Sequence, residues 1–232
     1  MKTRIVKILL LAAVVFSGTA LADGITIGGT RLIYSAEDNE ADIAVKNTNA
    51  SDPALIQSWV DDVGDNKKSP FIVTPPLFRL DANTENTLRV IQTSGSLPQD
   101  RESLFTLNIK VIPASHSKPG ENVLQFAIKN ELKLIYRPAG LPGSVLDAAK
   151  QLSWHQHGNT LRADNSSPYY VTITEFTVDG QLVRTPLAAS VLAPHGSQTY
   201  TLPARTPSGQ IQWRVLNDFG ASQDFSATVV AQ

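Results

Sequence analysis

Residues 122–138 alternate between apolar and polar side chains over their first half. Leu124, Phe126 and Ile128 share one face of an extended chain, and the residues between them face the other way. This period of two, with β-branched and aromatic residues, indicates a half-buried strand. The second half is more continuously apolar and ends at Pro138, which cannot continue a central ladder. We predict one long strand, whose apolar face belongs either to this protein's core or to another protein's.

The rest of the chain contains many short strand-like segments separated by Gly, Pro and Asn clusters. Such spacing is typical of sandwiches made of two antiparallel sheets. A Gly- and Pro-rich linker is expected at residues 139–143, and one short helix at residues 144–151. The sequence therefore predicts an all-β protein with a sandwich domain in residues 23–140 and a second, smaller one in residues 144–232.

The N-terminus has the pattern of a cleaved secretory signal. Lys2, Arg4 and Lys7 precede a short apolar run, and Ala20 and Ala22 provide the A-x-A spacing of a cleavage site. We expect residues 1–22 to be removed on export. No later stretch is apolar for long enough to span a bilayer, so the exported chain is expected to be soluble and not inserted in a membrane.

Composition excludes several classes of function. The 20 basic residues do not outnumber the 21 acidic ones, and the segment that is expected to be cleaved contains basic residues but no acidic ones. The mature chain is therefore mildly acidic, and a nucleic-acid partner is not expected. The chain has no cysteine. An exported protein without disulfides depends on its hydrophobic cores, and thiol chemistry, cysteine–zinc sites and blue-copper sites are excluded.

Motifs for catalysis are absent from the sequence. It contains no G-x-S-x-G, H-E-x-x-H, Walker or EF-hand pattern. His155 and His157 have the spacing of two ligands on one strand face, but a metal site needs more ligands than these two. Asp61, Asp62 and Asp65 lack the ligand spacing of known calcium loops. We therefore expect no enzymatic activity, no cofactor and no metal.

Five charged residues lie in apolar surroundings and suggest two kinds of role. Glu102, Arg137 and Asp218 either end strands in water or pair with one another where they are buried. Arg31 and Lys133 lie inside β-forming stretches. They either protect strand edges or together bind an anion in a cleft between the two domains.

Three motifs in the first domain and one in the second resemble a known family. They are LPQDRESLFTLNI at residues 97–109, closing on Ile112-Pro113, KLIYRP at residues 133–138, TPPLFRL at residues 74–80, and NDFGA at residues 217–221. Together they resemble the periplasmic pilus-assembly chaperones of the chaperone–usher pathway. The resemblance implies two immunoglobulin-like sandwiches in an L-shaped (boomerang) arrangement, in agreement with the two β domains read from the strand pattern.

The resemblance also implies a role for the strand at residues 122–138. Family members bind pilin subunits, which lack their last strand, by filling the exposed groove with a chaperone strand. Leu124, Phe126 and Ile128 match the groove-filling positions. Arg31 and Lys133 match the residues that hold the C-terminal carboxylate of the subunit.

Further expectations follow from the same resemblance. Glu102, Arg137 and Asp218 match a buried ion network between the domains. The loop at residues 114–121 is short, which indicates the short-loop type of chaperone. The chain is then expected in the periplasm, where it passes subunits to an outer-membrane usher. Because an exposed apolar strand edge is an aggregation hazard, a self-capping dimer of the free chaperone is a further expectation.

Two features leave alternatives open. Lys133 has the opposite parity to Leu124, so either a bulge intervenes or the anion cleft lies on the other face. Glu131, two residues before Lys133, is close enough in sequence to neutralise part of its charge.

The alternative function is a secreted β-sandwich adhesin or carbohydrate-binding module. Such a protein would present an aromatic-lined pocket on exposed loops. Trp59, Trp154 and Trp213 instead lie within strand-like runs, where core packing is expected.

Overall fold

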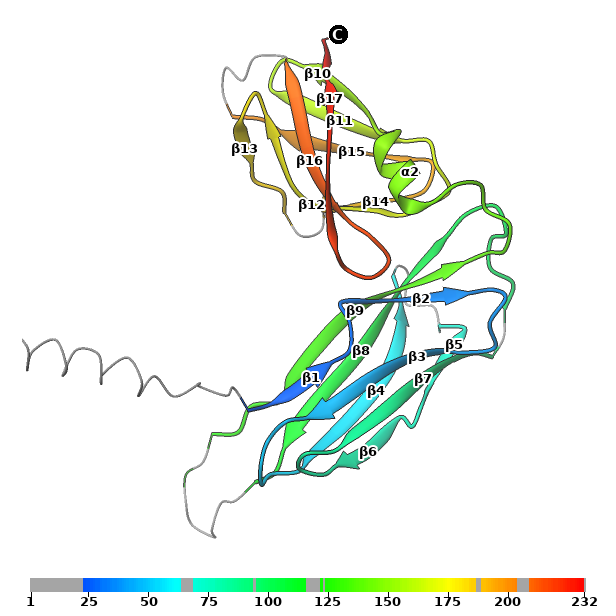
Figure 1. The fold of residues 1–232 in the computed structure, drawn as a ribbon, viewed down its shortest axis with the longest axis vertical. Coiled ribbons are helices and arrows are strands. Elements are labelled where there is room, and N and C mark those ends of the chain that lie inside the picture. Colours follow the sequence, from blue (N-terminus) through cyan, green and yellow to red (C-terminus); the bar gives the residue numbers. More distant parts are fainter. Residues whose placement is uncertain are drawn as a thin grey trace, which may run out of the picture.

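Two β-sandwiches make up the protein in the computed structural model, which describes residues 23–63, 69–93, 95–115, 122, 124–186, 189–203 and 209–231. Figure 1 shows them as separate bodies set at an angle, joined by the segment after residue 137. The predicted signal peptide and residues 116–121 of the predicted short loop lie outside the described residues. Among the described residues, no helix has the length and apolar character needed to cross a membrane.

The first domain packs two sheets against each other, and their strand pairs are antiparallel except for the parallel pair of β2 and β9. One sheet has the order β1-β3-β7-β5 and the other the order β2-β9-β8-β4-β6. The strands are β1 (Ile25–Ile27), β2 (Arg31–Ser35), β3 (Ala41–Asn47), β4 (Ala54–Asp62), β5 (Phe71–Thr74), β6 (Leu77–Leu80), β7 (Glu85–Gln92), β8 (Ser103–Pro113) and β9 (Ile128–Arg137). Alternate residues of these strands fill the core between the sheets, as a period of two requires.

Aromatic side chains occupy one end of this core. The ring of Phe71 lies 5.1 Å from that of Tyr34 and 5.0 Å from that of Phe105, both edge-on, and Tyr136 of β9 stacks on Tyr34. Offset and edge-to-face pairs of this kind add to the energy of simple burial. The C-terminal half of β9 is therefore held firmly in the core.

The second domain repeats the sandwich plan around its own core. Its sheets have the orders β15-β11-β10-β18 and β13-β12-β16-β17, and β14 pairs with β12. The elements are α2 (Val145–Lys150), β10 (Ser153–His157), β11 (Thr160–Asn165), β12 (Val171–Val178), β13 (Gln181–Val183), β14 (Val191–Leu192), β15 (Gly196–Thr201), β16 (Gln210–Leu216), β17 (Ser222–Thr228) and β18 (Val230–Ala231). The predicted all-β architecture of two sandwiches is confirmed.

The predicted short helix is also confirmed. Ser144 precedes α2 with an extended backbone, and its Oγ accepts a hydrogen bond from the backbone N–H of Asp147 at 3.2 Å. This contact satisfies one of the N–H groups that a helix leaves unpaired at its start.

The long strand predicted from residue 122 is shorter in the structure, where β9 begins only at Ile128. The ladder between β8 and β9 starts with the pair Val111–Ile128, and β8 ends two residues beyond, at Pro113. Neither Leu124 nor Phe126 belongs to a ladder among the described residues. An alternating sequence permits a strand, but the strand forms only where a partner supplies the backbone hydrogen bonds.

Candidate functional site

An apolar stripe runs beyond the end of the first sandwich. The side chains of Leu124, Phe126 and Ile128 are 78%, 69% and 64% exposed. Their parity is that of Leu132 and Leu134, which are buried in the core from β9. The core face of β9 is thus continued by three large apolar side chains that are mostly exposed in the described part of the chain.

One edge of β9 is open next to this stripe. On one side, β8 pairs with β9 from Ile128 to Tyr136. On the other side β2 runs parallel to β9 but covers only the segment that begins at the pair Arg31–Lys133. The edge from Ile128 to Leu132 therefore has no strand beside it among the described residues. An open edge of this kind can accept the backbone of a further strand.

Two unneutralised cations stand where the open edge ends. Arg31, the first residue of β2, is paired in register with Lys133, so the two side chains lie on the same face of neighbouring strands. Arg31 is only 8% exposed, and its Nε has no hydrogen-bond partner in the described structure. No ion pair joins either residue to an acidic group within the described ranges.

The pKa values of this pair reflect its crowding. Burial lowers the pKa of Arg31, against the fields of Asp218 and Glu102. Burial also lowers the pKa of Lys133, and the neighbouring Arg31 adds to the effect. Two partly desolvated positive charges side by side are unfavourable, and an anion bound between them would relieve both penalties.

The parity of Lys133 is settled by the ladder. The pairing of β8 with β9 runs from Val111–Ile128 to Ser103–Tyr136 without a register shift, so no bulge intervenes. Lys133 consequently faces away from the core side of β9, and the cation pair lies on the opposite face from the apolar stripe. Glu131 pairs with Lys129 and not with Lys133, so the proposed neutralisation of Lys133 by Glu131 is wrong.

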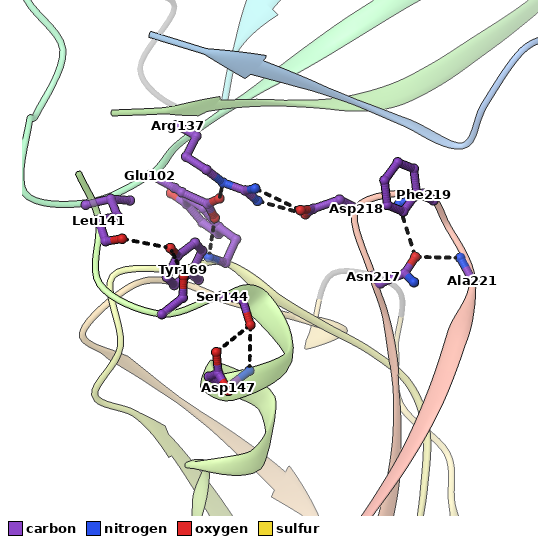
Figure 2. Close-up of polar contacts among 12 residues, drawn as sticks. Glu102, Arg137, Leu141, Ser144, Asp147, Tyr169, Asn217, Asp218, Phe219 and Ala221 are labelled. Carbon is purple, nitrogen blue, oxygen red and sulfur yellow. Dashed lines mark hydrogen bonds and ion pairs between the residues drawn. The ribbon is translucent and has the colours of Figure 1, made fainter. Parts of the chain in front are cut away.

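The structure brings Glu102, Arg137 and Asp218 together at the junction of the two domains (Figure 2). Arg137 Nε donates to Glu102 Oε1 at 2.7 Å, and its two Nη groups donate to the carboxylate of Asp218 at 2.8 and 2.7 Å. Glu102, only 2% exposed, also accepts a hydrogen bond from the backbone N–H of Tyr170 at 2.7 Å. Arg137 thus joins a buried carboxylate of the first domain to a loop of the second.

Burial dominates the electrostatics of this network. It raises the pKa of Glu102, although Arg137 acts in the opposite direction. For Arg137, burial alone would lower the pKa, but the hydrogen bond to Asp218 and the field of Glu102 outweigh it, so the pKa is raised. The guanidinium therefore stays charged, and it compensates the Glu102 carboxylate, which has almost no access to water.

Tyr169 and Tyr170 contact Arg137 and Glu102, and the sequence did not predict either contact. The guanidinium of Arg137 lies over the ring of Tyr169, 5.3 Å from its centre, and Tyr169 Oη donates to the carbonyl oxygen of Gly143 in the linker at 2.8 Å. The only sequence signal is a pair of tyrosines after Pro168, which does not by itself indicate partners 26 and 68 residues upstream.

The other residues considered in the sequence have structural positions. His155 Nε2 lies 3.8 Å from Asp164 Oδ2, and the described residues contain no group of three or more potential metal ligands. Trp154 and Trp213 pack in the second core, as expected. The core position predicted for Trp59 is wrong: it is only partly buried, and its Nε1 donates to Asp61 Oδ2 at 3.0 Å.

Comparisons with known proteins agree over almost the whole chain. Residues 24–142 match the family described as "Pili and flagellar-assembly chaperone, PapD N-terminal domain", and residues 147–227 match "Pili assembly chaperone PapD, C-terminal domain". The chain is 37% identical over 226 residues to the chaperone protein LpfB of Salmonella typhimurium, covering 96% of each chain. It is 42% identical over 216 residues to the chaperone protein FimC of Escherichia coli, covering 92% of this chain and 87% of FimC.

Solved structures give the same result. A chain in the complex of Salmonella enterica SafA pilin with the SafB chaperone superimposes with a TM-score of 0.79 at 33% identity, covering 90% of this chain and 98% of that one. The Escherichia coli chaperone DraB superimposes with a TM-score of 0.77 at 33% identity, covering 90% of this chain and 97% of DraB.

Proposed function

This chain belongs to the PapD family of pili-assembly chaperones, and we propose that it binds pilin subunits in the periplasm and passes them to an outer-membrane usher. The family resemblance drawn from the sequence motifs is thereby confirmed. The relative SafB is described in a complex with a pilin, SafA, which supports a pilin as the partner here. One observation carries the proposal: the strand with the exposed apolar stripe also carries half of an unneutralised cation pair.

The apolar stripe is the part that would fill the groove of a subunit. Leu124, Phe126 and Ile128 alternate, so they point together into whatever covers them. Each would contribute about 1.5–3 kcal/mol when fully buried, before the cost of ordering the segment is subtracted. The same segment gains backbone hydrogen bonds when a subunit strand lies beside it.

The open edge of β9 sets the direction of the added strand. A subunit strand that covers the edge from Ile128 to Leu132 meets the first residue of β2 end to end, because β2 begins at Arg31. If its last residue is to reach Arg31 and Lys133, the strand must run parallel to β9. Its terminal carboxylate then meets two cations that form no ion pair within the described residues.

The carboxylate would fix the register of the complex. Charge-assisted hydrogen bonds to Arg31 and Lys133 contribute about 1.5–3 kcal/mol each. A strand shifted by one residue would turn every apolar side chain to the wrong face and would leave its carboxylate away from the cations. Affinity then comes mainly from the stripe, and register comes from the cation pair.

Co-purification tests this proposal. The chain carrying Arg31→Ala or Lys133→Ala is co-expressed with a panel of pilin subunits, and the subunit retained on the tagged chaperone is quantified. We expect retention to fall at least tenfold for both variants, the loss of one charge-assisted bond. Arg162→Ala, which removes an exposed cation of the second domain, serves as the matched control and should retain the subunit. Undiminished retention with Arg31→Ala or Lys133→Ala would refute the anchor.

A further inference from the structure

Phe219 is the most exposed large apolar side chain among the described residues, at 95%. It lies in the loop between β16 and β17, and none of the aromatic contacts of the described structure includes it. A single exposed apolar residue is ordinary on a protein surface. Phe219 is distinguished by the rigidity of its loop and by the position of that loop beside the first domain.

The loop that carries Phe219 is held by its own hydrogen bonds. Asn217 Oδ1 accepts from the backbone N–H groups of Phe219 at 3.0 Å and of Ala221 at 2.9 Å (Figure 2). The backbone N–H of Asn217 donates to the carbonyl oxygen of Ala221 at 2.9 Å. Gly220 adopts a φ of +80°, which an L side chain rarely tolerates. The turn thus presents the Phe219 ring with little freedom to be lost on binding.

The same loop lies against the first domain on both sides of Phe219. Before it, Asp218 forms the paired hydrogen bonds with Arg137. After it, Gly220 lies so close to Thr30 that a Cβ on the glycine would stand 2.6 Å from Thr30 Oγ1. In Figure 1 the hairpin of β16 and β17 reaches from the second domain toward β2.

Thr30 marks the point where the added strand would end. It immediately precedes Arg31, the start of β2, and the subunit's last residue would arrive there with its carboxylate on Arg31 and Lys133. The field of Asp218 reaches Arg31 as well, which places the loop beside the cation pair. The side chain of a C-terminal residue is attached one bond from its carboxylate, so it must lie close to the tip of this loop.

We propose that Phe219 is a second contact for the subunit's C-terminus, packing against an apolar side chain of its last residue. This inference rests on the proposed function and adds to it a preference among subunits that differ in their last residue. The cation pair recognises any terminal carboxylate, whereas an apolar surface beside it favours chain ends with an apolar or aromatic last residue. Phe219 would thereby help to choose among subunits that all carry the same terminal charge.

Peptide titration tests the contact. Three 12-residue peptides of alternating valine and threonine are used, which end in tyrosine with a free carboxylate, in serine with a free carboxylate, or in tyrosine with an amide. We expect Phe219→Ala to weaken binding of the tyrosine-ended acid about three- to tenfold, the effect of partly burying one aromatic ring. Binding of the serine-ended acid should change less than twofold, and Phe219→Tyr should behave as the wild type.

Controls separate this contact from other effects. Leu182→Ala removes another exposed apolar side chain of the second domain, in β13, and should leave all affinities unchanged. The melting temperature of Phe219→Ala should equal that of the wild type, because the residue is 95% exposed in the described structure.

Each outcome has one reading. Equal losses for the tyrosine- and serine-ended acids, or no loss for either, would overturn the role of Phe219 while leaving the cation anchor intact. If the wild-type chain bound the amide as tightly as the acid, the anchor itself would fail. Binding of none of the peptides would overturn both proposals, because both require a free chain end to be recognised.

Discussion

Arg137→Met is expected to be one of the most damaging single substitutions at the junction of the domains. It keeps the length of the side chain but removes the only cation that is hydrogen-bonded to Glu102 within the described structure. The Glu102 side chain is almost fully buried, so its charge would be left without compensation and without water. Removing one partner of a buried pair typically costs about 3–5 kcal/mol. In a chain of this size such a loss corresponds to a fall of roughly 6–20 °C in melting temperature.

The effect of Arg137→Met should depend on pH. Burial already holds the pKa of Glu102 above its usual value, and Arg137 is the strongest influence in the opposite direction, so its removal raises the pKa further. A carboxyl group with a raised folded-state pKa contributes stability that is fully present below its unfolded pKa. That contribution is lost as the pH rises through the folded pKa. The stability deficit of Arg137→Met relative to wild type should therefore be larger at pH 8 than at pH 5.

Urea unfolding at pH 5 and pH 8 measures this deficit. Adding Glu102→Gln to Arg137→Met removes the stranded charge while still accepting the hydrogen bond from Tyr170, so it should restore most of the stability lost at pH 8. Arg79→Met, which breaks an exposed pair with Asp81, is the matched control and should cost less than about 1 kcal/mol. A loss below about 1 kcal/mol for Arg137→Met, or a loss equal at both pH values, would show that Glu102 is not the buried charge described above.

Three further outcomes are expected for the subunit site. Phe126→Asp should abolish co-purification of pilin subunits, because it places a charge in an apolar groove. Its melting temperature should be unchanged, because Phe126 is exposed and does not pack in the core. Lys133→Met should also lose the subunit. Its melting temperature should equal or exceed that of wild type, because a partly buried cation beside Arg31 is removed. A clear drop in melting temperature would contradict the unneutralised pair. In sedimentation velocity, the wild-type chain should form a concentration-dependent dimer that Phe126→Asp abolishes, and a monomer at all concentrations would argue against self-capping.

Local sequence determined much of the fold. A period of two placed Leu124, Phe126 and Ile128 on one face of an extended chain without any knowledge of their partners. It also separated the parity of Lys133 from that of the apolar stripe. These properties depend only on the order of residues along one strand, because successive side chains point to opposite faces wherever the chain is extended.

The tertiary structure decided what each strand meets. Whether a bulge precedes Lys133, and where β9 begins, depends on the register with β8, because a ladder exists only where both strands are present. Arg137 and Asp218 are 81 residues apart, and charge and hydropathy alone do not indicate that they pair. The position of the loop that carries Phe219 depends on the other domain in the same way. Sequence alone therefore determined the faces of the strands, and packing between distant segments determined which of those faces form a site.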